Sequence, residues 1–432
     1  MDIELSFWKI LLIKIKLSVI NWFGRFCEQF GLIINPLTWD DILSSFDKKD
    51  QKGANSDVFL ENQKKIINEI RLVKSKAPVR FREGIKYNIR RVIKQRLLMN
   101  KLILEDPSIF KIPIVKPVFI IGLPKADTTL LHNIFGLNAK FRVPLAYELR
   151  NYSEITSLAI DKDPVYHELN RLIICYKSCI SSNYCQMKNM RADKPEECHL
   201  IFEHLGLIFE YVYAFSPSDM LTYKKFMKAT LNDKPYQFDI YNYYKQIIQM
   251  ILRNDQDRTK RFVASSSIHL LYLPILVKLF PDAHFILIHR NVYQCILSLC
   301  LELEIFLKED WMINSDHIGR SVLAHFSDYS RIGLRNRRFL EDQGLANRFI
   351  DVDYENLKNC DTNGTIQEIY KKLEENISVD DMENLTNFME EYKGKDDGVE
   401  SSSLDKFGLT YDKVGSEMVE YIDFMQKLCL NH

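Results

Sequence analysis

The chain has 432 residues, of which 46% are hydrophobic and 27% are charged, and its formal net charge is zero. This composition is ordinary for a globular protein, and the balanced charge excludes the strong overall field that attracts nucleic acid, so we expect no nucleic-acid partner. The nine cysteines include no CxxC pair. That pattern argues against a disulfide framework or a zinc site and indicates a reducing compartment, here the cytoplasm.

The first apolar stretch is SFWKILLIKIKLSVINWFG, residues 6–24. Lys9, Lys14 and Lys16 interrupt it, so no run of the length needed to span a bilayer remains. It also lacks the basic region and the small-residue cleavage site of a signal peptide. We therefore favour a helix that is buried or packed against a partner or a second copy. The alternatives are a helix at a membrane surface, which would make the protein membrane-associated, and a signal anchor.

The next hundred residues predict a mainly helical region. Residues 47–57 are polar and predict a loop. Residues 58–73 have apolar positions near helical spacing, and residues 84–106 predict a long helix with basic residues on its solvated side. We predict that residues 1–110 form a helical N-terminal region packed on the core.

Three short apolar runs have the pattern of strands that are buried on both faces of a parallel sheet. They are residues 118–121, 283–289 and 347–354, and each of the last two follows a helical segment. Strands that alternate with helices predict an α/β fold, a parallel sheet flanked by helices. We place this domain at residues 111–432, with a helical insertion at about residues 161–250.

The first of these runs leads into GLPKADTTLLH, which predicts a phosphate-binding loop of P-loop type. A turn between a parallel strand and a helix presents free backbone N–H groups and the positive end of the helix dipole. Lys125 supplies a charge, and Thr128 and Thr129 can cap the helix or bond phosphate oxygens. The loop is not a Walker A motif, because the second glycine of that motif would fall at Asp127 and its lysine at Thr128. It is not a dinucleotide fingerprint either, because of the glycines in GxGxxG only Gly122 is present.

The loop resembles that of sulfotransferases, P-[RK]-[ST]-G-T-T, which holds the 5′-phosphosulfate of 3′-phosphoadenosine 5′-phosphosulfate (PAPS). FPDAHFILIHRNVYQCILSLCLE resembles the second half of that family's cofactor site, where Arg290 and Ser298 would hold the 3′-phosphate. The arginine fork matches phosphate oxygens in a bidentate way. The resemblance implies a binding set for PAPS or adenosine 3′,5′-bisphosphate of Gly122, Pro124, Lys125, Asp127, Thr128, Thr129, Arg290 and Ser298.

Other segments resemble the same family, in a branch common in bacteria and lower eukaryotes. They include FRVPLAYEL, RADKPEECHLIF, FVASSSIHLLYLPILVKLFPDAHFI and DVDYENLKNC, so that the resemblance covers nearly the whole chain. It implies transfer of a sulfuryl group from PAPS to a hydroxyl of a small molecule, lipid or glycan. No metal is required for this reaction, because the loop cation and N–H groups can stabilise the developing charge.

Three residues are candidates for catalysis. Lys125 would stabilise charge at the sulfuryl group, and Glu148 or His269 would be the general base. The alternatives for these last two are a surface or helix-capping glutamate and a core histidine. The acidic segment DKPEE at residues 193–197 predicts a helix N-terminus in preference to a metal site.

The sequence departs from the family pattern at the sulfate end of the site. Ala126 and Asp127 replace a hydroxyl residue and a glycine of the loop, and Ser265 replaces a lysine. These changes support an alternative function, a catalytically degenerate relative that binds a nucleotide or a protein partner. A kinase-like enzyme is disfavoured because the Walker lysine is missing.

Overall fold

A five-stranded parallel sheet forms the centre of the computed structural model, which describes residues 7–30, 32, 34–72, 79–179, 190–207, 225, 229–308, 314–392 and 403–429. The strand order is β2-β3-β1-β4-β5. All four pairings are parallel. The strands are β1 (Val118–Gly122), β2 (Phe141–Arg142), β3 (Arg261–Ser265), β4 (His284–His289) and β5 (Phe349–Asp353).

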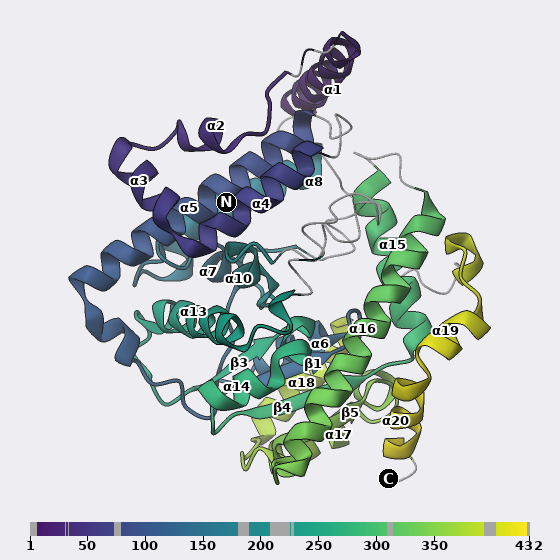
Figure 1. Cartoon of the computed structure of the whole chain (residues 1–432). Helices are drawn as coiled ribbons and strands as arrows, with labels where there is room; N and C mark the ends of the chain where they lie inside the picture. Colours follow the sequence, from purple (N-terminus) through teal and green to yellow (C-terminus); the bar gives the residue numbers. More distant parts are fainter. Residues whose placement is uncertain are drawn as a thin grey trace.

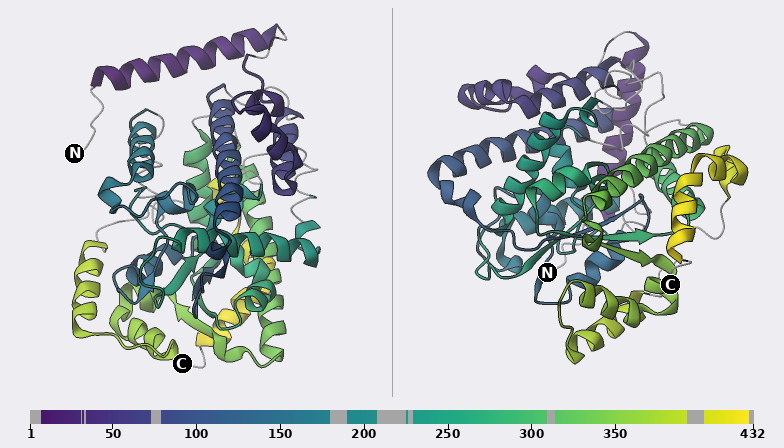
Figure 2. Two further views of the ribbon diagram at one scale, coloured as in Figure 1. Left: turned by 90° about the vertical axis from the view of Figure 1, so that its left-hand side faces the viewer. Right: turned by 60° about the horizontal axis from the view of Figure 1, so that its bottom comes forward.

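The central strand is apolar along its whole length because it is covered on both faces. Every residue of β1 is buried, and Ile120 pairs with Ser265 on one side and with Ile286 on the other. Helices lie on both sides of the sheet, with α16 (Ser315–Asp342) on one side and α17 (Thr362–Lys372) and α18 (Val379–Tyr392) on the other (Figure 2). The predicted α/β fold is confirmed.

The strands predicted from apolar runs are β1, β4 and β5, and two further strands were not predicted. β2 has only two residues, which is too short for any periodic pattern. β3 begins with Arg261 and ends with Ser265, so only its three middle residues are apolar. Both lie on the same side of β1, and β3 pairs with it directly.

The N-terminal region stacks on one side of the molecule, away from the C-terminus (Figure 1). The helices predicted at residues 58–73 and 84–106 are α4 (Val58–Leu72) and α5 (Val79–Glu105). The loop predicted at residues 47–57 is wrong, because α3 (Lys48–Ser56) occupies it. The Asp47 carboxylate accepts a 2.8 Å hydrogen bond from the amide of Asp50, a helix cap that starts this polar segment. The domain boundary at residue 110 stays a prediction.

The first helix, α1 (Phe7–Gln29), is the outermost element of the N-terminal region (Figure 2, left). One of its faces packs on α5 and α8, and the opposite face is exposed, so the favoured interpretation of a buried helix holds for one face only. Among the residues that the structure describes, no helix is both long enough and apolar enough to cross a membrane.

The region predicted as a helical insertion, where the structure describes it, is mainly helical but includes the non-helical residues 190–198. It contains α8 (Pro164–Cys179), α10 (His199–His204) and α13 (Lys234–Leu252). The remaining helices are α2 (Trp39–Leu43), η1 (Pro107–Lys111), α6 (Thr128–Phe135), α7 (Ala146–Arg150), η2 (Ile160–Lys162), η3 (Ser267–Tyr272), α14 (Leu273–Leu279), α15 (Val292–Lys308), η4 (Ala346–Arg348), the π-helix η5 (Asn356–Cys360), η6 (Leu404–Phe407), α19 (Tyr411–Glu417) and α20 (Val419–Cys429).

Candidate functional site

The candidate site begins at the carboxyl end of β1, where a tight turn leads into α6. Gly122 is required here, because a Cβ atom would lie 2.9 Å from Ala126 Cβ and 3.1 Å from the backbone oxygen of Ile288. Lys125 and Asp127 adopt left-handed backbone conformations, with φ angles of 67° and 66°. Aspartate tolerates this conformation better than most residues, so the turn keeps the geometry for which the family's glycine is suited.

Arg290 joins the loop to the end of β4. Its Nη1 donates a 3.0 Å hydrogen bond to the backbone oxygen of Lys125, and its Nε donates to the side chain of Gln294. The guanidinium lies 4.4 Å from the ring centroid of Tyr354, the residue that follows β5. The ends of β1, β4 and β5 therefore meet around one arginine, at the sheet edge where open α/β sheets bind ligands.

Ser298 lies on the face of α15 that is turned toward the loop. Cys295 Sγ, three residues earlier, donates to the backbone oxygen of Lys125. Glu302, four residues after Ser298, forms a 2.8 Å ion pair with Lys125 Nζ. Residues three and four apart share one helix face. The structure thus brings Lys125, Arg290 and Ser298 to one place.

The ion pair of Lys125 is partly shielded, because the side chain of Glu302 is only 9% exposed and that of Lys125 is 27% exposed. A lysine whose charge is already compensated attracts an incoming anion less strongly than a free one. Sequence reasoning missed Glu302. Its spacing of four residues from Ser298 was the available signal.

Asp127 is the N-cap residue that precedes α6, yet its side chain does not cap the helix. Both carboxylate oxygens instead accept hydrogen bonds from the hydroxyl of Tyr392, at 3.2 and 3.4 Å. Tyr392 is the last residue of α18 and lies 265 positions away in the chain. This contact holds the carboxylate on the side of the loop that faces α18, and no local sequence pattern could have indicated it.

The two threonines of the loop differ in environment. Thr128 is buried, and its Oγ1 donates a 3.3 Å hydrogen bond to Glu197 Oε1, whereas Thr129 is exposed on α6. Pro124 is partly exposed within the turn. Glu197 belongs to the acidic segment that predicted a helix N-terminus, and α10 does begin nearby at His199. The contact with Thr128 places Glu197 at the candidate site as well.

Glu148 is held by an arginine. Its two carboxylate oxygens accept hydrogen bonds of 2.5 and 3.0 Å from Arg142, and one of them also accepts from the amide of Leu145. Burial lowers the pKa of Arg142, but its pairing with Glu148 and Asp255 outweighs this effect and raises that pKa above its usual value. The arrangement keeps Arg142 charged and leaves Glu148 only 5% exposed.

His269 lies inside the core, in an aromatic layer. The hydroxyl of Tyr241 lies 3.1 Å from its Nδ1, and that of Tyr244 lies 3.4 Å from its Nε2. The ring also meets Phe119 of β1 edge to face. Burial lowers the pKa of His269 to about 3, so the imidazole is neutral at neutral pH. These contacts are those of a satisfied core histidine.

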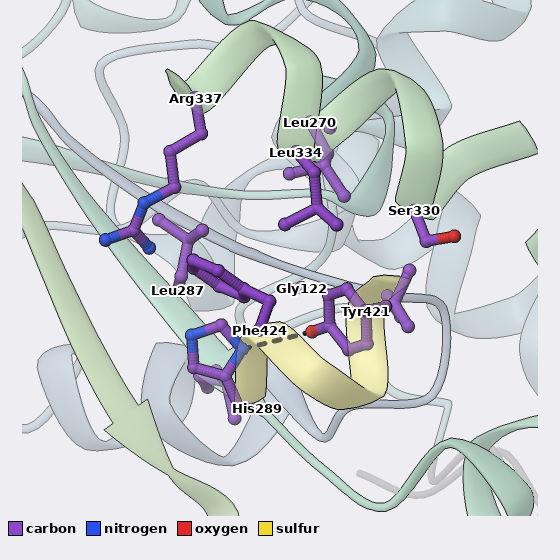
Figure 3. A pocket seen from close by; sticks show the side chains of 12 residues that line it. Gly122, Leu270, Leu287, His289, Ser330, Leu334, Arg337, Tyr421 and Phe424 are labelled. Carbon is purple, nitrogen blue, oxygen red and sulfur yellow. Dashed lines mark hydrogen bonds between the residues drawn. The ribbon is translucent and has the colours of Figure 1, made fainter. Parts of the chain in front are cut away.

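Behind the loop, a small pocket separates the ends of β1 and β4 from α16 and α20 (Figure 3). The hydroxyl of Tyr421 lies 3.1 Å from His289 Nδ1, and Asp351 lies 2.7 Å from His289 Nε2. Burial raises the pKa of Asp351, but hydrogen bonds from Arg337 and His289 outweigh it and hold this pKa well below its usual value. The network fixes the residue that immediately precedes Arg290, and apolar side chains occupy much of the pocket.

Within the described part of the chain, no three histidine, cysteine or acidic side chains form a group that could hold a metal ion. Four residues lie at the site that the sequence did not predict as site residues: Glu197, Glu302, Tyr354 and Tyr392. Tyr354 follows a predicted strand and could have been found by the rule that parallel strands carry functional residues at their carboxyl ends.

Comparisons with known proteins agree on one family. The model described as "Sulfotransferase family" matches residues 117–380. Sulfotransferase STF9 from Mycobacterium avium has a similar crystal structure, with a TM-score of 0.74 and 18% identity over 91% of this chain and 98% of that one. Sulfotransferase STF1 from Mycobacterium tuberculosis H37Rv matches with a TM-score of 0.68 and 20% identity over 89% and 98%. At these identities the likeness shows the fold alone. The search of curated proteins gave no match.

Proposed function

Because this chain belongs to the sulfotransferase family, we propose that it transfers a sulfuryl group from PAPS to a hydroxyl of a small molecule, lipid or glycan. The observation that carries the proposal is the hydrogen bond from Arg290 to the backbone oxygen of Lys125. It joins the two halves of the predicted cofactor site at the carboxyl edge of the sheet. The six cysteines that the structure describes as free support a cytoplasmic setting.

In this proposal the two halves hold opposite ends of the nucleotide. Arg290 and Ser298 bind the 3′-phosphate, and the N–H groups of the turn with Thr128 and Thr129 bind the 5′-phosphosulfate. Gly122 and Pro124 shape the turn, and Asp127 occupies its left-handed position. PAPS supplies the activated sulfuryl group, and Lys125 stabilises the charge that develops on it. Lys125 must first release its ion pair with Glu302 before it can bind the anion.

Three side chains are candidates for the general base, and they differ in their exposure to solvent. His269 is 0% exposed and Glu148 is 5% exposed and bound to Arg142. The side chain of Glu197 is 29% exposed and contacts Thr128. A base must come within about 3 Å of the acceptor hydroxyl. Of the three side chains Glu197 is the most exposed, so an acceptor can reach it without rearrangement of the core, and we rank it before Glu148 and His269.

Kinetics of matched variants separate these candidates. With Glu197 as base, Glu197→Gln lowers kcat by about a hundredfold without weakening bisphosphate binding. Under this ranking Glu148→Gln and His269→Gln mainly lower thermal stability, because they break a buried ion pair and a core hydrogen bond. Their effect on kcat is smaller than that of Glu197→Gln. A hundredfold loss of kcat in a stably folded Glu148 or His269 variant would reverse the ranking.

A second function is supported by a specific observation. The one lysine of the loop is bound to Glu302, and Asp127 places a further negative charge in the same turn. This arrangement suits a relative that binds a nucleotide or a partner without transferring sulfate.

The two functions are separated by calorimetric titration of the full chain with adenosine 3′,5′-bisphosphate and with PAPS, followed by an assay against a panel of hydroxyl acceptors. Binding of both ligands with sulfated product supports the transferase. Binding of the bisphosphate without any product supports the second function. If neither ligand binds, both proposals about the nucleotide are wrong.

A further inference from the structure

The first helix has two faces of different character. One face is fixed to the protein: Gly24 lies so close to Val79 of α5 that a Cβ would collide with it, and Glu28 forms a 2.9 Å ion pair with Arg82. The opposite face is open. Because both contacts are specific, α1 presents the same side outward on every molecule.

The open face is a continuous apolar stripe. Successive helix residues are turned by about 100°, and the stripe covers a sector of roughly 160°. Its exposed side chains are Leu12, Ile15, Val19, Ile20, Trp22, Phe23 and Phe26, which are between 45% and 66% exposed. Trp22, Phe26 and Phe30 form a row of rings with centroid separations of 5.8 and 5.2 Å. Isolated exposed apolar residues are ordinary, but an aligned stripe of this length marks an interaction surface.

The charges in and beside the stripe have one sign. Lys14 and Lys16 are exposed: by helical geometry Lys16 lies within the stripe, and Lys14 lies between the stripe and the packed side. Glu28, the single acidic residue in the sequence of α1, is directed to Arg82 on the packed side. The outer face of the helix therefore combines apolar area and aromatic rings with two lysines that form no ion pair with any residue that the structure describes.

We propose that this face of α1 docks on an anionic lipid surface. Apolar side chains would enter the boundary between headgroups and acyl chains, aromatic rings prefer that depth, and the lysines would meet lipid phosphates and carboxylates. A second copy is a poorer match, because its own stripe brings the same lysines and no acidic residue to pair with them. The inference is independent of the proposed sulfuryl transfer.

The test is flotation of the full chain with vesicles of phosphatidylcholine, with and without phosphatidylserine. We expect binding to the vesicles that contain phosphatidylserine and weaker binding to phosphatidylcholine alone. Trp22→Ser with Phe26→Ser should lower vesicle affinity by at least about tenfold. Lys14→Gln with Lys16→Gln should lower affinity about tenfold for the anionic vesicles alone.

The matched control is Leu104→Ser with Val379→Ser, which removes two apolar side chains that are 84% and 83% exposed elsewhere. It should leave flotation unchanged. Thermal melting checks that the surface changes leave the fold intact. The proposal is overturned if the wild-type chain does not float, or if the control and the Trp22/Phe26 variant behave alike. It is also overturned if sedimentation without lipid shows a dimer that the Trp22/Phe26 variant dissociates, because a second copy then covers the stripe.

Discussion

The two halves of the proposed nucleotide site differ in how much of their binding chemistry is in place. At the Arg290 half, the side chains that the family pattern requires are present, and a buried network supports them from behind. At the loop half the backbone is in place, but its polar groups face acidic partners: Lys125 faces Glu302, and Thr128 faces Glu197. The loop half therefore combines the backbone geometry of the proposed phosphate site with acidic side chains around it.

This difference has a physical consequence for ligand binding. The 3′-phosphate would meet the guanidinium of Arg290, which is held in place. The 5′-phosphosulfate, in contrast, must displace Glu302 from Lys125 and Glu197 from Thr128. Anion affinity depends on net local charge more than on loop shape. We therefore expect the affinities for adenosine 3′,5′-bisphosphate and for PAPS to depend on Arg290, which meets the 3′-phosphate that they share, and also on the acidic side chains near the loop, which meet the 5′ group of each ligand.

The largest effect should come from Arg290→Ala. Loss of a bidentate charged contact costs about 3 kcal/mol, which is roughly a hundredfold in affinity for adenosine 3′,5′-bisphosphate. Calorimetry measures this change. Arg290→Lys should recover only part of it, because lysine lacks the fork. Arg331→Ala, at a side chain that is 62% exposed on α16, is the control. An unchanged affinity in Arg290→Ala would remove the distinction between the halves.

The next largest effect should come from the carboxylate in the loop. Asp127→Asn removes its charge, and we expect PAPS to bind about tenfold more tightly, which corresponds to about 1.4 kcal/mol. Asp127→Gly should do the same and also relieve the left-handed backbone. Equal affinities in the wild type and both variants would show that Tyr392 already holds the carboxylate away from the ligand.

The sequence predicted the parts of this site that follow from local pattern. An apolar run before Gly122 indicated β1, and the resemblance of the segment around Arg290 and Ser298 to sulfotransferases implied the second half of the site. The ion pair of Lys125 joins residues 177 positions apart, and the Tyr392 contact spans 265. Such contacts depend on how strands and helices pack, which no single-sequence periodicity contains.

His269 also shows what the sequence alone could not predict, namely the surroundings of a side chain. Its position in the family-like segment made it a candidate base, and nothing in that segment shows what surrounds it. The aromatic layer around it comes from α13, through Tyr241 and Tyr244, and from β1, through Phe119. Burial is a property of the packed core, so residue type and spacing predicted the histidine but not its environment.

A smaller effect is expected from Glu302→Gln. The change leaves the partly buried Lys125 without its counter-charge, which should lower the unfolding free energy by about 1–2 kcal/mol. The freed ammonium should also bind PAPS about fivefold more tightly, so that PAPS restores most of the lost thermal stability. The control is Glu304→Gln, because Glu304 lies on the same helix as Glu302 but pairs with Lys406 of η6 and, among the described residues, makes no polar contact with the loop. Destabilisation without tighter PAPS binding would show that Glu302 only supports the fold.

The smallest effect should come from Tyr421→Phe, which tests the support behind Arg290. The variant removes the hydroxyl that bonds His289 and keeps the ring that packs against Phe424. Loss of one buried hydrogen bond should lower the unfolding free energy by about 1 kcal/mol. Bisphosphate affinity should change by less than about twofold, because Asp351 still holds the other nitrogen of His289. Denaturant unfolding and calorimetry on the same samples measure both quantities. A loss of affinity near that of Arg290→Ala would mean that the Arg290 half of the site depends on the contact between Tyr421 of α20 and His289 for its geometry.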